Sequence, residues 1–163
     1  DVGTGGGCPG LPGAIARPLW SLTLLDSTRK KVQAVQTLAE SLDLREVEFV
    51  ADRAELAGQN PLHRACYDLV LIRAVGPAST CAEYAIPLLR MQGIAVLYRG
   101  QWREADSDAL APALEKLGGE LVDVRQTKTP ITGAERTCLY LQKAAVTENQ
   151  YPQDNGVPAK LTL

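Results

Sequence analysis

A glycine-rich segment at the start of the chain has the composition of a loop that holds a nucleotide-like ligand. Five glycines lie within residues 1–10. Glycine has no Cβ, so such a loop can approach a ligand closely and can adopt positive φ angles. Gly5, Gly7 and Gly10 also match G-x-G-x-x-G, the spacing of loops that place a pyrophosphate at a helix amino terminus. By itself this match leaves open which nucleotide-like ligand is bound.

Two aspartates make the ligand more specific. Asp1 precedes Gly3 and Gly5 in the pattern D-x-G-x-G, where its carboxylate can face an ammonium group. S-adenosylmethionine carries such a group and no phosphate, whereas a dinucleotide has less use for the anion. Asp26 follows the apolar segment 21–25, and a carboxylate there can accept hydrogen bonds from both ribose hydroxyls. Because NAD sites share this feature, Asp26 indicates a nucleoside without selecting between the two cofactors.

A third polar segment, residues 52–55, comes just after the apolar segment 47–50. Loops at the carboxyl ends of parallel strands meet at the binding crevice of an open α/β sheet. We therefore expect Ala54 and Glu55 to border an adenine. The alternative is that Arg53 and Glu55 form an ordinary solvated ion pair, and their position alone does not decide between the two interpretations.

The elements that would position these residues alternate between apolar runs of strand length and longer segments of helical period. This alternation is typical of a doubly wound, Rossmann-like α/β fold with a mostly parallel sheet. A glycine loop of this kind normally follows a strand, so we expect the first, central strand to be largely missing. The predicted strands cover residues 21–25, 47–50, 67–73, 94–99, 120–125 and 137–142, and the predicted helices cover 28–42, 79–89 (bent or shortened by Pro87) and 105–117.

The composition fits one globular domain over residues 1–143, followed by a polar and flexible tail over 144–163. The net charge of -2 offers no general attraction to a polyanion, so any contact with nucleic acid must be local. The four cysteines form no C-x-x-C pair, and the single histidine, His63, lies in a polar loop, so neither a metal site nor a disulfide is expected. No run approaches the ~20 apolar residues of a membrane span, which favours a cytoplasmic protein.

Four separated segments resemble the RsmG family, also called glucose-inhibited division protein B. They are DVGTGGGCPGLPGAIARP, LTLLDSTRKKV, ADRAE and LIRAV, in this order, and the resemblance runs from Asp1 to about Lys143. The strings LLDSTRKK and YRGQW look most like cyanobacterial members. The resemblance implies a class I S-adenosylmethionine-dependent methyltransferase fold with an antiparallel last strand. It also implies transfer of a methyl group to N7 of a guanine in 16S ribosomal RNA by a monomeric enzyme whose amino-terminal region is absent here.

Residue by residue, the resemblance implies a set of cofactor contacts in these segments. Cys8 departs from the family, which commonly has a larger apolar residue at this position. A contact through the backbone would survive that change. The implied contacts are Gly3, Cys8, Asp26, Ser27, Thr28, Ala54, Glu55 and Arg73.

Methylation of guanine N7 uses a lone pair that carries no proton, so no general base is required and no catalytic residue is assigned. Arg73 ends the apolar segment 67–73, and we expect this charge at the crevice rim to orient the cofactor or the guanine. Arg99 and Arg136 follow strand ends or loops on the expected substrate side and are candidates for contacts to RNA phosphates.

Other residues have two interpretations. Tyr98 and Trp102 could stack on a splayed base, but plain packing is the stronger interpretation. The basic run Arg29, Lys30 and Lys31 is better explained as a solvated helix face than as an RNA-binding stripe. For the whole chain, the alternatives are a methyltransferase for another substrate, an NAD-binding Rossmann protein, and an inactive fragment.

Overall fold

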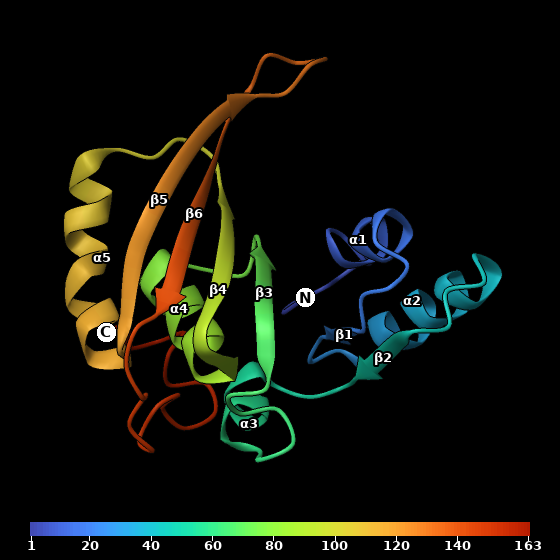
Figure 1. Cartoon of the computed structure of the whole chain (residues 1–163), viewed down its shortest axis with the longest axis horizontal. Coiled ribbons are helices and arrows are strands. Elements are labelled where there is room, and N and C mark those ends of the chain that lie inside the picture. The colour runs from blue at the N-terminus through green and yellow to red at the C-terminus, as the bar shows by residue number, and fades with distance from the viewer.

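The computed structural model describes residues 1–163, which form six strands flanked by helices (Figure 1). All six predicted strands and all three predicted helices are present, so the α/β class is confirmed. Pro87 lies in a short 3-10 helix that follows a shortened α4. The strands are β1 (Leu22–Leu25), β2 (Val47–Val50), β3 (Tyr67–Arg73), β4 (Leu89–Arg99), β5 (Gly119–Lys128) and β6 (Glu135–Lys143), and the helices are α1 (Gly10–Ala16), α2 (Arg29–Ser41), α3 (Ala54–Gln59), α4 (Ala78–Ala85), η1 (Ile86–Leu88) and α5 (Glu104–Leu117).

Successive strands are added on opposite sides of one residue near the amino terminus, Val2. β1 pairs in parallel with β2, and β3 pairs in parallel with β4. Val2 forms a parallel bridge to both Leu25 and Ile72, so it joins these two pairs and stands alone in the place of a central strand. β6 lies between β4 and β5 and is antiparallel to both, which confirms the expected antiparallel last strand. The order across the sheet is therefore β2, β1, Val2, β3, β4, β6, β5.

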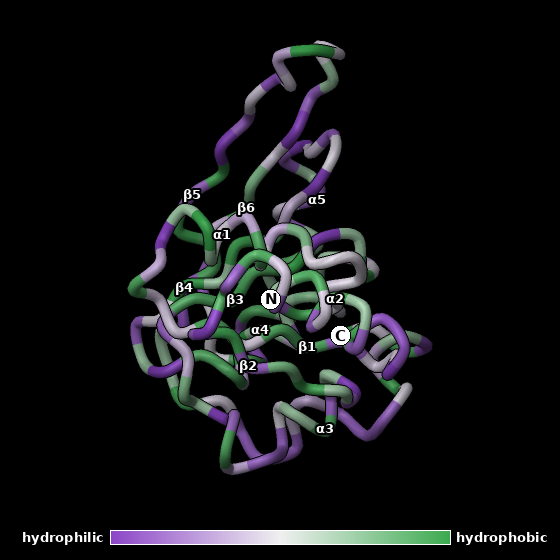
Figure 2. Tube along the Cα trace, turned by 90° about the vertical axis from the view of Figure 1, so that its right-hand side faces the viewer, coloured by the Kyte–Doolittle hydropathy of each residue, from purple (hydrophilic) through white to green (hydrophobic).

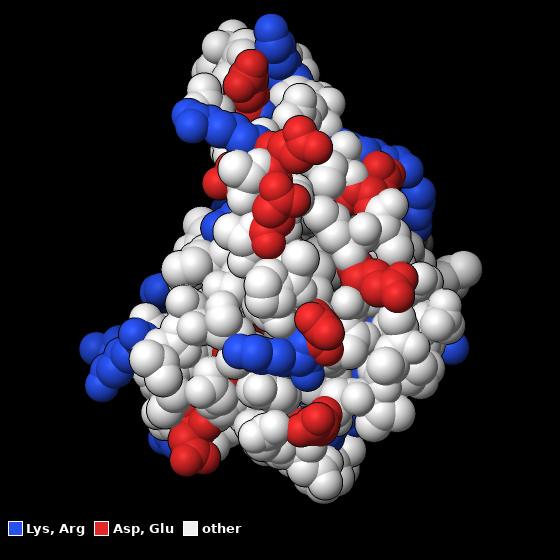
Figure 3. Space-filling view, turned by 90° about the vertical axis from the view of Figure 1, so that its left-hand side faces the viewer, with Lys and Arg blue, Asp and Glu red and all other residues white.

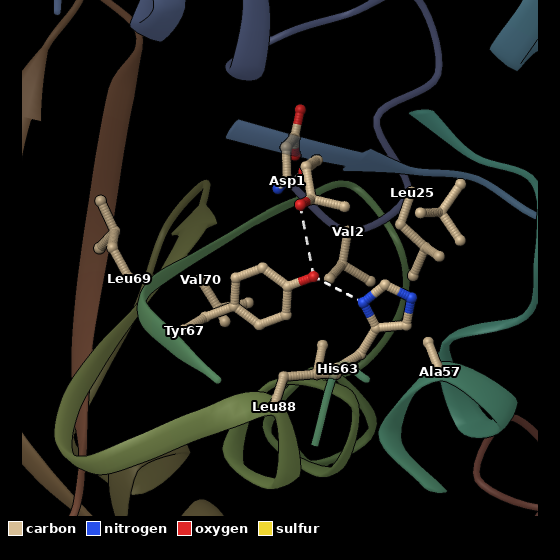
Figure 4. A pocket seen from close by; sticks show the side chains of 11 residues that line it. Asp1, Val2, Leu25, Ala57, His63, Tyr67, Leu69, Val70 and Leu88 are labelled. Carbon is tan, nitrogen blue, oxygen red and sulfur yellow. Dashed lines mark hydrogen bonds between the residues drawn. The ribbon is translucent and has the colours of Figure 1, made fainter. Parts of the chain in front are cut away.

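A small cavity lies beside Val2, between β1 and β3, which are joined to each other in the sheet only through Val2 (Figure 4). The Tyr67 hydroxyl crosses this gap, lying 2.7 Å from His63 Nδ1 and 3.3 Å from Thr23 Oγ1. His63 is thus half-buried and hydrogen-bonded, which corrects the expectation of a simple loop-surface residue. The cavity has only about 30 Å³, the space of roughly one water molecule, and it lies towards the amino ends of the strands. It is too small for a ligand site.

The main core is formed by β3, β4 and β6 with α4 and α5, and includes Ile72, Leu97 and Leu141. A smaller cluster joins α1, β1 and α2 through Leu11, Leu24 and Val35. Figure 2 shows the hydrophobic segments concentrated on the strands in the middle of the molecule, while the projecting β5–β6 hairpin is largely hydrophilic. None of the helices is both long enough and apolar enough to span a bilayer.

Two short helices were not predicted. α1 follows the glycine loop directly, and its sequence GLPGAIA has glycine or proline at three of seven positions, which conceals the helical period. α3 has six residues, too few to repeat an apolar face. Both helices begin at a carboxyl end of the sheet and therefore shape the crevice that the loops were expected to form alone.

Residues 144–163, called the tail below, contain no helix or strand, in accord with the expected irregular segment. The tail was also expected to be flexible, yet it is attached to the domain by hydrogen bonds from two side chains near α3. The Arg64 guanidinium donates to the carbonyl oxygens of Tyr151 (2.7 Å) and Thr147 (3.0 Å). Gln59 Nε2 donates to the carbonyl oxygen of Pro152 at 2.8 Å. In Figure 1 the red tail accordingly lies beside α3 and α4.

Candidate active site

Two neighbouring cavities open at the carboxyl ends of β1, β2, β3 and β4. They lie near Val2, which separates the β1–β2 pair from the β3–β4 pair. A ligand crevice is expected at this position in an open α/β sheet. The cavity beside β1 and β2 has a volume of about 340 Å³ and is called the nucleoside cavity here. The second, more open cavity, beside β3 and β4, has about 890 Å³ and is called the outer cavity. Both volumes lie in or near the roughly 300–1,000 Å³ range of small-molecule sites.

The nucleoside cavity gathers residues from three segments that lie far apart in the sequence. The glycine loop, the end of β1 and the start of α3 each contribute to its wall, as the topology of parallel strands predicts. Six of the eight expected cofactor contacts line it: Gly3, Asp26, Ser27, Thr28, Ala54 and Glu55.

Gly3 brings the backbone of the glycine loop against β1 and the loop after β3. Its φ angle is +69°, and its amide donates to the carbonyl oxygen of Leu25 at 2.8 Å. A Cβ at this position would lie 2.5 Å from Val75 Cγ2, closer than real side chains approach. Only glycine therefore fits this position without moving Val75, which itself lines the nucleoside cavity.

The substitution Gly3→Ala is expected to weaken binding of S-adenosylhomocysteine at least tenfold, because it adds a steric clash and a strained φ angle in the cavity wall. A left-handed conformation costs a non-glycine residue about 1–2 kcal/mol before the clash is counted. Gly6→Ala is the matched control, since a Cβ there meets nothing within 4 Å. Isothermal titration of both variants checks this, and equal affinities for the two would remove the role of Gly3.

Asp26 connects the glycine loop to the start of α2. Its side chain is only 7% exposed, and its two oxygens accept hydrogen bonds from the Gly5 amide at 3.0 Å and the Thr28 amide at 2.9 Å. Each carboxylate oxygen has a second lone pair that can still accept a hydroxyl. The carboxylate can therefore position the loop and also bind a ribose.

Glu55 has a different surrounding from the one expected. Its side chain is 2% exposed, and Oε1 accepts hydrogen bonds from Arg53 (3.1 Å), the Gly156 amide (2.9 Å) and the Tyr84 hydroxyl (3.4 Å). The ion pair with Arg53 exists, but it is not solvated on the glutamate side. The carboxylate thus stabilises the cavity wall, and a contact with an adenine would involve the rest of the residue.

The acid–base properties of this group are consistent with that structural role. Burial raises the pKa of Glu55, but hydrogen bonds from its own amide, from Gly156 and from Arg53 outweigh burial and hold the pKa below its ordinary value. Burial, followed by the adjacent Glu55 carboxylate, raises the pKa of Tyr84 to about 12. The hydroxyl of Tyr84 therefore stays protonated and remains a donor to the carboxylate.

Asp1 does not line the nucleoside cavity, contrary to the expectation that it faces an ammonium group there. Its Oδ2 accepts hydrogen bonds from the Thr4 hydroxyl at 2.8 Å and from the Gly10 amide at 3.0 Å. The carboxylate is thus directed into the glycine loop and the start of α1. Oδ2 thus organises the loop, whereas the buried Oδ1 has no hydrogen-bond partner in the chain.

The outer cavity contains the other two expected cofactor residues, Cys8 and Arg73, together with both RNA candidates, Arg99 and Arg136. Ala74 lines both cavities and therefore lies at their junction. Its φ angle is +57°, an uncommon conformation for a residue with a Cβ. Backbone strain of this kind is often found at functional sites.

The cationic and aromatic side chains of the outer cavity differ in how far they are already engaged. Arg99 Nη1 donates to the Gly76 carbonyl oxygen at 2.6 Å, so part of its guanidinium holds the loop after β3. Arg73 and Arg136 are exposed and have no acidic partner within ion-pair distance. Trp102 packs against the core and donates from Nε1 to Ser107 Oγ at 2.8 Å, which supports the packing interpretation while one side of the ring still borders the cavity.

Several lining residues were not predicted from the sequence. Lys31 belongs to the exposed basic run on α2, and its side chain also borders the nucleoside cavity. Asp52 follows β2 directly, so the rule that named Ala54 could have found it. Tyr84 and Ala159 lie far along the chain, and no local pattern marks them.

Comparison with known proteins agrees with this geometry. The sequence model of the family described as rRNA small subunit methyltransferase G matches residues 1–137. Ribosomal RNA small subunit methyltransferase G of Synechococcus elongatus is 54% identical over 163 residues, which are 100% of this chain and 67% of that protein. The protein of the same name from Trichormus variabilis is 46% identical over 160 residues, covering 98% of this chain and 65% of the relative. The chain therefore spans about two thirds of the length of these relatives.

Solved structures with low sequence identity share the fold. A 16S rRNA (adenine(1408)-N(1))-methyltransferase from Catenulisporales acidiphilia, solved with its cosubstrate SAM, has a TM-score of 0.69 at 18% identity, with 91% of this chain and 85% of that chain covered. The cyclase SpnF has a TM-score of 0.68 at 15% identity, covering 91% of this chain and 74% of that one. Because one fold serves different reactions, these structures establish the class I methyltransferase fold alone. Because the family model matches residues 1–137 and the relative from Synechococcus elongatus is 54% identical over the whole chain, the NAD-binding alternative is wrong: this chain belongs to the rRNA small subunit methyltransferase G family and uses S-adenosylmethionine.

Proposed function

We propose that this chain transfers a methyl group from S-adenosylmethionine to N7 of a guanine in 16S ribosomal RNA. The observation that supports this most directly is the junction of the two cavities at Ala74. A nucleoside cofactor in one cavity and a base in the other would meet there. We further propose that the enzyme acts as a monomer in the cytoplasm, where its RNA substrate is found.

The residues of the nucleoside cavity fit this cofactor. Asp26 presents a buried carboxylate towards a ribose, Gly3 leaves room where a Cβ would clash, and Ala54 borders the end assigned to the adenine. When bound, the cofactor supplies an electrophilic methyl group on a sulfonium.

The remaining residues position the acceptor. Guanine N7 attacks through a lone pair, so no side chain has to remove a proton first, and alignment of the two reacting atoms provides most of the rate enhancement. Arg73 lies next to Ala74 and lines only the outer cavity. From there its guanidinium can donate to guanine O6 while leaving N7 free.

Contacts to the RNA backbone would have to be local, since the net charge is -2. Figure 3 shows Lys and Arg side chains interspersed with Asp and Glu on the face that carries α5, without a continuous basic surface. The outer cavity, by contrast, gathers three arginines from different parts of the chain. We propose this cavity as the region that receives the RNA.

A methylation assay tests the proposed function. The chain is incubated with small ribosomal subunits that lack the modification and with S-adenosylmethionine carrying a tritiated methyl group. Borohydride reduction followed by aniline cleaves RNA at N7-methylguanine, so a single new cleavage in 16S RNA is expected. Label incorporated without such a cleavage would indicate another substrate atom, and cofactor binding without any label would indicate an inactive fragment.

The substitution Arg136→Ala is expected to weaken RNA binding about fivefold at physiological salt, because it removes one exposed cation from the outer cavity. The slope of log affinity against log salt concentration should fall by about one for the loss of one phosphate contact. Arg90→Ala is the control. Arg90, on β4, is exposed like Arg136, but it pairs with Asp68 and does not line the cavity. Filter binding at four salt concentrations distinguishes the two variants, and identical slopes would assign Arg136 no phosphate.

A further inference from the structure

The tail takes part in the wall of the nucleoside cavity. Ala159 lines the cavity together with Glu55 and Tyr84. Three residues earlier, the Gly156 amide donates to Glu55 Oε1 at 2.9 Å. The match to the family model ends at residue 137, whereas the relative from Synechococcus elongatus aligns with the whole chain, tail included. The tail thus lies outside the matched segment, yet it borders the cavity.

Further hydrogen bonds hold this part of the tail on α4. Glu83 is 0% exposed, and its two carboxylate oxygens accept hydrogen bonds from the Gln153 amide (2.6 Å) and the Gln153 side chain (3.2 Å). Thr80, also buried, donates to the carbonyl oxygen of Pro158 at 2.9 Å. Buried polar groups need partners, and here the tail is the partner of Glu55, Glu83 and Thr80.

The contacts follow one another along the chain in a way that determines the position of the wall. Gln153 binds Glu83, Gly156 binds Glu55, and Pro158 binds Thr80, so the segment is attached at both ends and in the middle. Gly156 has a φ angle of +81°, a left-handed conformation that favours glycine. A Cβ at Gly156 would meet nothing within 4 Å, so a change there would act through the tail backbone and its hydrogen bond to Glu55.

We propose that residues 153–159 of the tail are part of the cofactor-binding site. They form the wall of the cavity at the base end of the nucleoside and increase the affinity of the protein for the cofactor. This inference rests on the proposed function only in assigning the cofactor to this cavity. It predicts reciprocal coupling, because a ligand that binds more tightly when the tail is in place must also stabilise the tail in that position.

The substitution Gly156→Pro tests the proposal. Proline has no amide proton for Glu55 and cannot adopt the observed φ angle. We expect S-adenosylhomocysteine to bind about tenfold more weakly by isothermal titration. Gly133→Pro is a matched control, because Gly133 also has a positive φ (+63°) and donates one backbone hydrogen bond, to Thr129, but lies in the β5–β6 turn. This control should bind like the parent.

Hydrogen exchange of the parent chain gives a second measurement that needs no variant. Addition of S-adenosylhomocysteine should slow exchange of the Gln153 and Gly156 amides severalfold and leave the Gly133 amide unchanged. Parent-like affinity in Gly156→Pro, or unaltered tail exchange, would overturn the role of the tail while leaving the proposed function in place. A parent chain that binds no S-adenosylhomocysteine would overturn both.

Discussion

Replacing Asp26 by alanine is expected to reduce the affinity for S-adenosylhomocysteine by a hundredfold or more, the largest effect of any single change in this site. The carboxylate accepts hydrogen bonds from the amides of Gly5 and Thr28, and Asp26 is only 7% exposed. Leaving a buried donor without a partner costs about 1–3 kcal/mol, and a hydrogen bond to a charged group contributes about 1.5–3 kcal/mol. Loss of the ribose acceptor and loosening of the loop together exceed the roughly 2.7 kcal/mol that a hundredfold change requires.

Two comparison variants separate these contributions. Asp26→Asn keeps the size of the side chain and one acceptor oxygen, so about a tenfold loss is expected. Asp43→Ala removes an aspartate whose side chain is 78% exposed and pairs only with Arg45, and it should leave binding unchanged. Isothermal titration and thermal unfolding are measured for all three. If Asp26→Ala bound as tightly as the parent, the carboxylate would have no part in holding the cofactor.

The sequence could predict that these segments come together at the nucleoside cavity, because their meeting follows from one topological rule. The residues after β1 and β2 and the glycine loop all lie at carboxyl ends of parallel strands, and such ends meet at the same edge. The positions of the six strands along the chain could be predicted from apolar runs alone. For Asp26 and Ala54, a position just after a predicted strand was enough to place them, and Gly3 was placed by the glycine loop, although their contacts with a ligand stay a prediction.

The surrounding of Glu55 could not be predicted in the same way. Its partner Gly156 lies 101 residues later, in a segment without helix or strand. The polarity of the tail suggested a flexible segment, because composition reports the lack of a core but not the hydrogen bonds available on a neighbouring surface. The buried carboxylates of Glu55 and Glu83 attract tail amides, and that complementarity appears only in three dimensions.

The sequence also could not predict which of the expected cofactor residues line the nucleoside cavity and which line the outer cavity. Cys8 belongs to the glycine loop and Arg73 to the end of β3, so both were expected beside the cofactor. In the structure Cys8 lies two residues before the unpredicted helix α1, and it lines the outer cavity together with Arg73. A backbone contact from Cys8 to the cofactor stays a prediction, and the position of Arg73 favours the guanine as its partner.

Arg73→Ala is therefore expected to lower kcat for methylation about a hundredfold while changing the affinity for S-adenosylhomocysteine less than twofold. The side chain is exposed in the outer cavity, has no acidic partner, and neighbours Ala74 at the junction of the cavities. A cation that orients guanine would act on alignment of the reacting atoms, and small misplacements there cost about a hundredfold. Single-turnover methylation of small ribosomal subunits, with titration of the cofactor in parallel, measures the two quantities separately.

Arg73→Lys distinguishes orientation from charge, because lysine keeps the cation but lacks the planar fork of donors. It should recover only part of the rate if O6 is held by the guanidinium, and nearly all of it if charge alone matters. Arg29→Ala provides the control, since Arg29 is exposed on α2 and lines neither cavity. A loss of cofactor affinity in Arg73→Ala that matches the loss of rate would instead place this arginine on the cofactor, as the resemblance to the family first implied.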